Sequence, residues 1–195
     1  MSELFSIQLQ NRQQQGRDGV WLDLPTTTEQ VQAALRQIGI SSDNPQGLFI
    51  SGYFAEEEKR FAIPYNMVLA SNVDELNFLA SRLETLSTGE RAELNAALQA
   101  PQSELFSIGR ITDFPENVDY YVHLPDVHTT AALGDYYLNR SGMVDMPEEW
   151  KGGIDTAQFG RYVAQQEQGA FTQYGYLVKS GDEWQNCLLY TSPSP

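Results

Sequence analysis

Two short segments near the beginning of the chain alternate apolar and polar residues, and this alternation constrains the fold more than any other feature. Residues 5–9 and 20–24 each place an apolar side chain at every second position, and the polar stretch 11–19 joins them. A period of two is typical of β-strands with one buried face. The sequence therefore predicts a two-stranded hairpin that ends at Pro25, with Trp21 packed on a face of the sheet.

The apolar period changes after Pro25. Thr26 and Glu29 have the spacing of a capping box, and the apolar residues that follow lie at i, i+3, i+4 and i+7, which predicts a helix ending at Gly39. A turn at 44–47 then leads to an apolar run over 48–54. Residues 1–64 are thus predicted to form an N-terminal α/β domain of order ββαβ. The helix contributes Val31, Ala34, Leu35 and Ile38 to its core.

Residues 65–115 predict a helical middle domain. Asn72 is placed to cap a helix, Ser87 and Glu90 have capping-box spacing for a second helix, and a short third helix is expected over 102–110. The inward stripes of the first two helices are Val73, Leu76, Leu79, Leu83 and Leu86, followed by Leu94 and Leu98.

Residues 116–185 predict a mixed α/β C-terminal domain. A strand over 120–124 precedes a helix over 129–140, with Asp126 as its expected cap and Gly142 as its end. The remaining expected elements are a helical turn at 147–150 with Pro147 as its first residue, a helix capped by Asp155, and a hairpin over 170–179 that turns at Gly175. The fold class is therefore α+β, with three small consecutive domains.

The tail 186–195 differs in composition from the rest of the chain. It contains no charged residue, and it holds the single cysteine, Cys187. It resembles a translated sequencing-adapter read-through, so we expect it to be a non-native or disordered tail. The alternative is an ordinary Ser/Pro-rich terminus, and neither interpretation gives it a function.

The charge of the chain restricts its partners. It has 26 acidic and 12 basic residues, a formal charge of −14, and its basic residues are scattered except for the Lys59–Arg60 pair. Direct binding to nucleic acid or to anionic lipid needs Lys/Arg patches and is not expected. No signal peptide or membrane span is predicted, so a cytoplasmic location is expected.

No motif predicts an enzyme. The P-loop, G-x-G-x-x-G and G-x-S-x-G patterns do not occur, and two histidines, His123 and His128, with one cysteine are too few to predict a zinc site. We therefore expect neither a metal nor a cofactor.

The density of net negative charge grows toward the C-terminus. The formal charge is −3 over 1–64, −4 over 65–115 and −7 over 116–195. Carboxylates three or four residues apart on a helix lie about 5–6 Å from each other, close to the spacing of successive phosphates in a nucleic acid strand. Glu90 and Glu93 have this spacing. The alternative interpretation is that these faces are merely solvated surface.

Four strings of the chain, in order along it, are similar to one known family. They are Gly19–Leu24 (GVWLDL), the helical segment 74–87, Tyr136–Glu148 (YYLNRSGMVDMPE) and Ile154–Arg161 (IDTAQFGR). Their order and content resemble the ArdA-type antirestriction proteins, which are DNA mimics carried by mobile elements. Tyr162 stands where the family usually has Asp, and the acidic density is lower than in typical members.

The resemblance implies an elongated molecule that dimerises through its C-terminal domain and lays carboxylates along its length like DNA phosphates. It further implies that the partner is the methyltransferase core of a type I restriction-modification enzyme. The expected dimer contacts are Tyr136, Tyr137, Trp150, Phe159 and Tyr162. The expected DNA-mimic residues are Asp74, Glu75, Glu84, Glu90, Glu93, Glu104, Asp113, Glu116, Asp119, Asp126, Asp135, Asp145, Glu148, Glu149 and Asp155. The main alternative is an acidic protein-interaction adaptor without DNA mimicry, and an enzyme is third.

Overall fold

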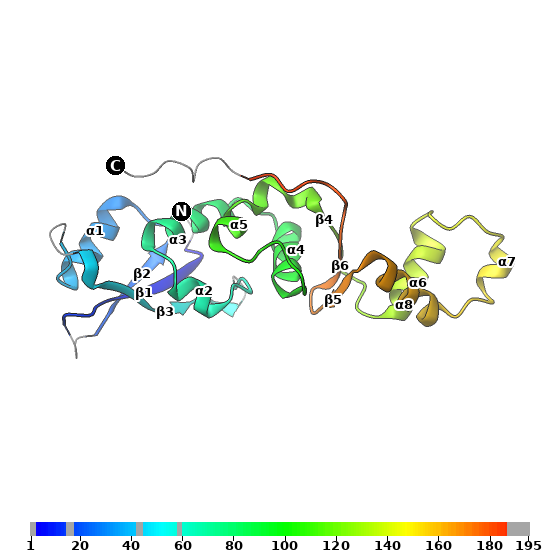
Figure 1. Cartoon of the computed structure of the whole chain (residues 1–195), viewed down its shortest axis with the longest axis horizontal. Coiled ribbons are helices and arrows are strands. Elements are labelled where there is room, and N and C mark those ends of the chain that lie inside the picture. The colour runs from blue at the N-terminus through cyan, green and yellow to red at the C-terminus, as the bar shows by residue number, and fades with distance from the viewer. Residues whose placement is uncertain (1–2, 15–17, 42–44, 58–59, 187–195) are drawn as a thin grey trace. The chain divides into compact units, whose positions relative to one another are not determined.

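The computed structural model describes residues 3–14, 18–41, 45–57 and 60–186, so the tail from Cys187 onward lies outside the described residues. Contacts divide the chain into two compact units. Among the described residues, unit 1 comprises those up to Ser87, Leu105–Pro115 and Asn186, and unit 2 comprises Thr88–Glu104 and Glu116–Gln185. Helices and small sheets occur together in the chain (Figure 1), which confirms the α+β class, whereas the division into three consecutive domains stays a prediction.

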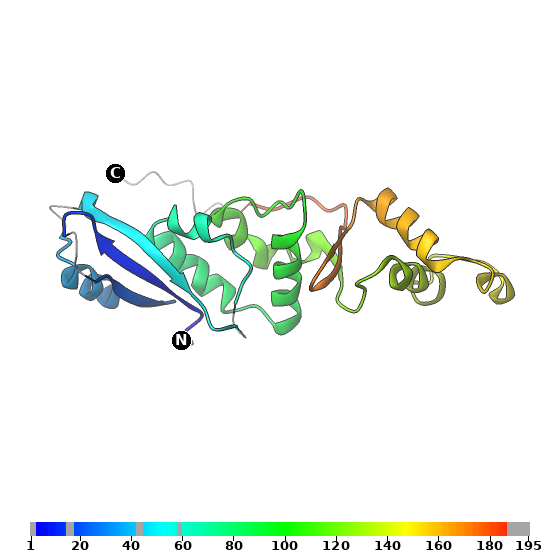
Figure 2. The same ribbon diagram turned by 90° about the horizontal axis from the view of Figure 1, so that it is seen from below.

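Unit 1 contains an antiparallel sheet of order β2-β1-β3. Figure 2 shows β1 and β3 side by side. Its strands are β1 (Phe5–Asn11), β2 (Val20–Leu24) and β3 (Leu48–Phe54). The predicted hairpin is confirmed, because Ile7 and Leu9 of β1 pair with Leu22 and Val20 of β2. Ile7, Leu9 and Leu24 are fully buried, as the alternation predicts.

Helix α1 (Thr28–Gln37) follows β2, and its cap corrects the predicted one. The side chain of Thr27, not Thr26, accepts from the backbone N–H of Gln30, and Gln30 completes the capping box. Thr26 is committed elsewhere, since its backbone N–H donates to Asn77 Oδ1 at 2.7 Å and its carbonyl accepts from Asn77 Nδ2 at 3.0 Å. The helix ends at Gln37 with Ile38 as its C-cap, and Gly39, the predicted end, follows the cap with a φ of +69°.

The helical segments that complete unit 1 are short. Asn72 caps α3 as predicted, accepting from the backbone N–H of Glu75. The helix predicted over 102–110 is wrong in its bounds, because α5 begins only after its cap, Ser107. The elements are η1 (Pro45–Gly47), α2 (Tyr65–Leu69), α3 (Val73–Leu83) and α5 (Ile108–Thr112), with η3 (Phe114–Glu116) after α5.

Unit 2 contains a second antiparallel sheet, of order β4-β6-β5. The predicted hairpin over 170–179 is confirmed, although its turn is at residues 173–174 and Gly175, with a φ of +117°, is the first residue of β6. The elements of the unit are α4 (Thr88–Gln99), η4 (Val118–Tyr120), β4 (Tyr121–Leu124), α6 (Thr130–Asp135), η5 (Tyr136–Arg140), α7 (Glu148–Lys151), α8 (Thr156–Glu167), β5 (Ala170–Thr172) and β6 (Gly175–Lys179).

The N-cap of α6 also differs from the predicted one. Thr129 caps the helix by accepting from the backbone N–H of Ala132, so Asp126 is not the cap. The chain first makes a turn in which Val127 N–H donates to Leu124 O and the Val127 side chain is buried. Helix α6 then continues as the π-helical turn η5, in which Ser141 N–H donates to Tyr136 O at 2.8 Å.

Asp155 caps α8 as predicted, accepting from the backbone N–H of Gln158 at 3.0 Å. The helical turn predicted at 147–150 is present as α7, where Pro147 occupies the cap position and not the first helical position. A small core joins these elements: Val127, Leu133 and Tyr176 are buried together, with Val163 of α8 packed against them.

Candidate functional site

Most of the acidic residues proposed from the sequence have solvent-accessible side chains. Eight are exposed, namely Asp74, Glu116, Asp119, Asp126, Asp145, Glu148, Glu149 and Asp155. Six are half-buried, namely Glu75, Glu84, Glu90, Glu93, Glu104 and Asp135. Asp74 belongs to unit 1 and the other seven exposed members belong to unit 2, so the exposed part of the set lies mostly in unit 2.

Asp113 has to be removed from this set. It is the C-cap residue of α5, and its relative exposure is 6%. A carboxylate so little exposed does not present its charge to another molecule. The sequence does not predict the burial of Asp113, because the five-residue helix α5 is too short to show an apolar period. Thr112, the residue before it, is also buried.

Glu93 on α4 is a second special case. Burial raises the pKa of its carboxyl to about 8, and the nearby carboxylates Glu90 and Asp119 add to the shift. Its Oε1 atom is buried without a hydrogen bond. At pH 7 most Glu93 side chains are therefore protonated and neutral. The Glu90–Glu93 spacing predicts a pair of phosphate-like charges, but Glu93 supplies little of that charge at neutral pH.

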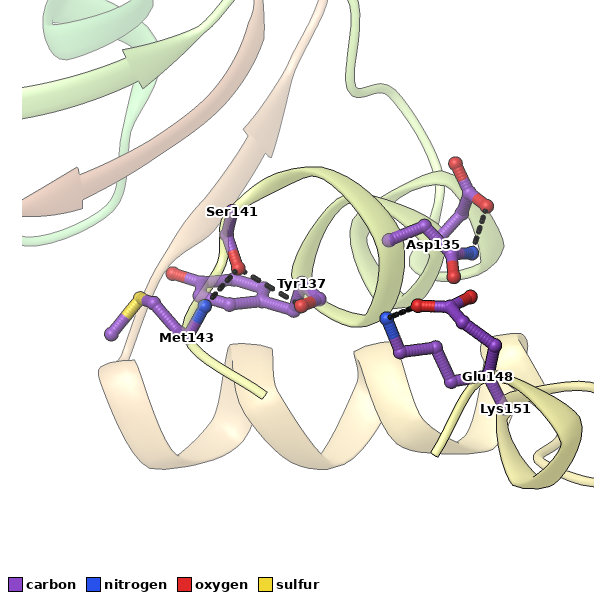
Figure 3. A network of polar contacts seen from close by, with 7 residues as sticks. Asp135, Tyr137, Ser141, Met143, Glu148 and Lys151 are labelled. Carbon is purple, nitrogen blue, oxygen red and sulfur yellow. Dashed lines mark hydrogen bonds and ion pairs between the residues drawn. The ribbon is translucent and has the colours of Figure 1, made fainter. Parts of the chain in front are cut away.

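Asp135, Glu148 and Glu104 each lie beside a basic side chain of the described residues. Arg140 Nη2 lies 3.4 Å from Asp135 Oδ2, Lys151 Nζ lies 2.6 Å from Glu148 Oε1, and Lys179 Nζ lies 2.8 Å from Glu104 Oε1. Figure 3 shows the Glu148–Lys151 pair and Asp135, which also accepts from Asn139 Nδ2. These pairs reduce the local negative potential.

Other exposed carboxylates of the set face solvent. Within the described ranges, Asp74, Asp126, Asp145 and Glu149 form no ion pair. Asp145 and Glu149 flank Glu148 in the segment around α7. This segment is therefore the most clearly acidic part of the C-terminal third.

A recess in unit 2 contains two acids that sequence reasoning missed. It has a volume of about 420 Å³, and its lining residues are Glu116, Asn117, Asp119, Tyr120, Asp182, Glu183, Trp184 and Gln185. Asn117 fixes the strap 182–185, because it donates to Gln185 O at 2.8 Å and accepts from Gln185 N–H at 2.7 Å. Asp182 and Glu183 lie more than 60 residues from Glu116 in the sequence, and no motif links them.

The aromatic residues proposed as dimer contacts separate into two groups. Tyr136 and Tyr137 pack against the core of unit 2, and the Tyr137 hydroxyl donates to Glu167 Oε1. Trp150 and Tyr162, in contrast, are 66% and 59% exposed. Phe159 is half-buried, and Met143, which the sequence does not predict as a dimer contact, is 74% exposed.

Glu167 itself was not predicted as an important residue. It accepts hydrogen bonds from Tyr137 and, at 3.0 Å, from the Tyr176 hydroxyl. Burial and the Glu167 carboxylate raise the pKa of both tyrosines. Glu167 is thus a structural carboxylate, and its charge is directed at the core of unit 2.

Two kinds of feature are absent from the part of the chain that the structure describes. No group of three or more His, Cys, Asp or Glu side chains there is arranged to hold a metal ion. None of the helices in the same ranges is both long enough and apolar enough to cross a membrane.

Comparison with known protein families gives a match over most of the chain. The profile of the antirestriction protein (ArdA) family matches residues 15–178. The matched range includes all four strings on which the resemblance rests. No curated protein matches the chain.

Proposed function

This chain belongs to the ArdA antirestriction protein family, and we propose that it inhibits type I restriction-modification enzymes by occupying their DNA-binding groove in place of DNA. The observation that supports this most is the set of exposed carboxylates without an internal cation, in unit 1 and in unit 2. No chemical step is needed. An enzyme built to contact phosphates with Lys and Arg gains similar contacts from carboxylates that the fold already holds in place.

The magnitude of the charge agrees with this proposal. Each chain has a formal charge of −14. Duplex DNA carries one charge per about 1.7 Å, so two chains together match roughly 48 Å of duplex. DNA must be bent or deformed in many complexes, whereas a folded protein has no such cost.

We further propose that the active species is a homodimer joined through the C-terminal region. Trp150 and Tyr162 are large, apolar and exposed, as is typical of residues that anchor a protein interface. Two chains of −14 repel each other, so the interface must bury enough apolar surface to offset that repulsion.

The alternative is an acidic adaptor whose apolar surface recruits a partner while its charge only provides solubility. The two proposals differ in salt dependence. A mimic that replaces phosphates loses affinity steeply as the salt concentration rises, whereas an apolar contact does not.

The test is binding of the purified protein to the methyltransferase core of a type I enzyme, with duplex DNA as competitor. We expect DNA to displace the protein, and we expect the affinity to fall by at least about tenfold between 50 and 200 mM salt. An affinity that does not change with salt, or simultaneous binding of DNA and this protein to the enzyme, would contradict DNA mimicry and favour the adaptor.

A further inference from the structure

The outer face of the unit 1 sheet carries exposed aromatic side chains that charge mimicry does not explain. Trp21 on β2 is 50% exposed, and Phe54 at the end of β3 is 56% exposed. Solvated aromatic side chains gathered on one sheet face are uncommon on a protein without a partner there.

The strand register places Trp21 and Phe54 on the same face. Gln8 of β1 pairs with Trp21 on one side and with Gly52 on the other. Ser6, two residues before Gln8, pairs with Phe54. Because side chains alternate along a strand, Ser6 and Gln8 point to one face, and their partners Trp21 and Phe54 share it.

The indole of Trp21 is held in position by the sheet. A Cβ added at Gly52 would lie 3.0 Å from Trp21 Cη2, so the indole extends across β1 to β3 and rests where Gly52 has no side chain. Gln8, beneath it, is fixed because Ser51 Oγ donates to Gln8 Oε1 at 3.0 Å. One side of the indole is therefore packed, and half of its surface stays open.

Two carboxylates lie at the Ser6 end of this face. Ser6 Oγ is 2.8 Å from Asp23 Oδ1 and 3.4 Å from Glu3 Oε1. Both acids are exposed. The outward positions of the three strands, none of them Lys or Arg, are Ser6, Gln8, Gln10, Trp21, Asp23, Phe49, Gly52 and Phe54. Arg12, which follows β1, lies over the Phe49 ring, 5.3 Å from its centroid, beside Gln10 and not at the Ser6 end where Asp23 and Glu3 lie.

We propose that this face binds an arginine side chain of a protein partner, which stacks on Trp21 and pairs with Asp23 and Glu3. The charges are complementary, because an exposed aromatic ring and two carboxylates on the same face both attract a cationic side chain. A guanidinium suits this arrangement better than an ammonium group, because it is planar, stacks on aromatic rings and donates to two oxygens at once. The identity of the natural partner rests on the proposed function, whereas arginine binding by this face does not.

The first experiment uses a blocked hexaarginine peptide and the full chain, observed through the indole N–H signals in NMR spectra. The chain has three tryptophans, and Trp21→Phe identifies the Trp21 signal. We expect that signal to shift with hexaarginine, to shift less with hexalysine, and to shift less in a Glu3→Gln/Asp23→Asn variant. A Trp21 signal that does not move, that moves equally with hexalysine, or that is indifferent to the double variant would overturn the proposal.

The second experiment measures binding to the methyltransferase core. Trp21→Ala is expected to weaken binding about tenfold while the salt dependence changes little, since one buried aromatic contact is lost and most charges remain. Phe106→Ala is the matched control, because Phe106 is 65% exposed in the same unit but lies off the sheet, and it should change affinity less than about twofold. Far-ultraviolet circular dichroism checks that both variants are folded.

The two experiments separate the possible failures. If the wild type does not bind the enzyme at all, the proposed function fails, and the peptide experiment still decides arginine binding. If the wild type binds and Trp21→Ala binds equally well, the sheet face is not part of the interface. A dimer that dissociates on Trp21→Ala, seen by light scattering, would assign the face to a second copy of the chain and overturn the arginine site.

Discussion

Gly134 of α6 and Gly160 of α8 lie against each other with no side chain between the two helices. A Cβ added at Gly160 would be 2.6 Å from Gly134 N, and one added at Gly134 would be 3.0 Å from Gly160 N. Each Cβ would also collide with a backbone carbonyl of the opposite helix, that of Thr130 or that of Thr156. The helix pair therefore depends on the absence of a side chain at both positions.

The first prediction concerns this contact. Gly160→Ala should destabilise unit 2 by roughly 1–3 kcal/mol or more, because rigid backbone has to move to admit the methyl group. Gly89→Ala is the control: Gly89 is in α4, its added Cβ meets nothing within 4 Å, and the change should be neutral or stabilising. Thermal unfolding measures both variants. Equal melting temperatures for Gly160→Ala and the wild type would refute the close contact.

A second prediction concerns Glu167, which accepts hydrogen bonds from Tyr137 and Tyr176. Glu167→Ala should cost about 2–4 kcal/mol of stability, because it leaves two partly buried hydroxyl groups without their acceptor. Tyr137→Phe removes one donor together with its demand for a partner and should cost less. Chemical denaturation gives the ordering, and the reverse ordering would show that the carboxylate is not the centre of this group.

The order of elements could be predicted from sequence wherever local signals agreed with burial. The alternation of β1 and β2, the cap Asn72 and the cap Asp155 are all signals within one element. The sequence-based prediction was wrong where two neighbouring residues had the same local signal and a contact with a residue distant in the sequence decided between them. Thr26 and Thr27 both have capping-box spacing, and the hydrogen bonds of Asn77 to the Thr26 backbone settle the choice.

A repeated hexapeptide also shows that local sequence alone does not determine the backbone. The hexapeptide Ser-Glu-Leu-Phe-Ser-Ile occurs at 2–7 and again at 103–108. Phe5 in the first copy is buried in β1, whereas Phe106 in the second is 65% exposed and precedes the cap of α5. Identical local propensities thus give different backbones, because the first copy is paired with two other strands.

The candidate acidic surface could be predicted as a composition but not residue by residue. Exposure of a carboxylate depends on which helix face packs inward, and the sequence showed this for the stripe of α3 but not for the short helix before Asp113. The neutral state of Glu93 depends on burial and on Asp119, which is 26 positions away in sequence and has no motif in common with it.

Glu93 gives a third prediction, on pH dependence. Its pKa is about 8 in the folded chain against an ordinary 4.5, so the folded state binds the proton more tightly than the unfolded state does. Its contribution to stability is complete below about pH 4.5 and is lost as the pH rises to 8. The unfolding free energy of Glu93→Gln, relative to that of the wild type, should therefore rise by about 2 kcal/mol from pH 5 to pH 9, after allowance for solvent screening.

The measurement is the difference in unfolding free energy between variant and wild type at the two pH values. Glu149→Gln, at an exposed position, is the control and should show the same difference at both. A difference for Glu93→Gln that does not change with pH would refute the raised pKa. Inhibition at pH 7 should be nearly unchanged in Glu93→Gln, because the substituted side chain is already largely neutral there.

A fourth prediction concerns the homodimer. Light scattering at micromolar concentration and moderate salt should give the mass of two chains, and Trp150→Ser/Tyr162→Ser should give the mass of one, since these two side chains are the exposed members of the predicted interface. Phe106→Ser, an equally exposed aromatic in unit 1, is the control and should stay dimeric. A wild type that scatters as one chain would remove the dimer.

The last prediction tests the function through groups of charges. If binding is spread over many carboxylates, a single change such as Glu149→Gln should matter little, and four changes together should weaken inhibition markedly. The C-terminal group is Asp145→Asn, Glu148→Gln, Glu149→Gln and Asp155→Asn, in which Asn at 155 preserves the cap of α8. The matched group, also exposed, is Asp18→Asn, Glu29→Gln, Glu56→Gln and Glu57→Gln in unit 1.

Both groups remove four negative charges, so a general effect of net charge would weaken inhibition equally in the two variants. We expect the C-terminal group to lose more affinity and more of its salt dependence, because residues 116–195 carry −7 of the −14. Equal losses would mean that net charge and not position determines binding, and no loss in either variant would leave the acidic surface without a role in inhibition.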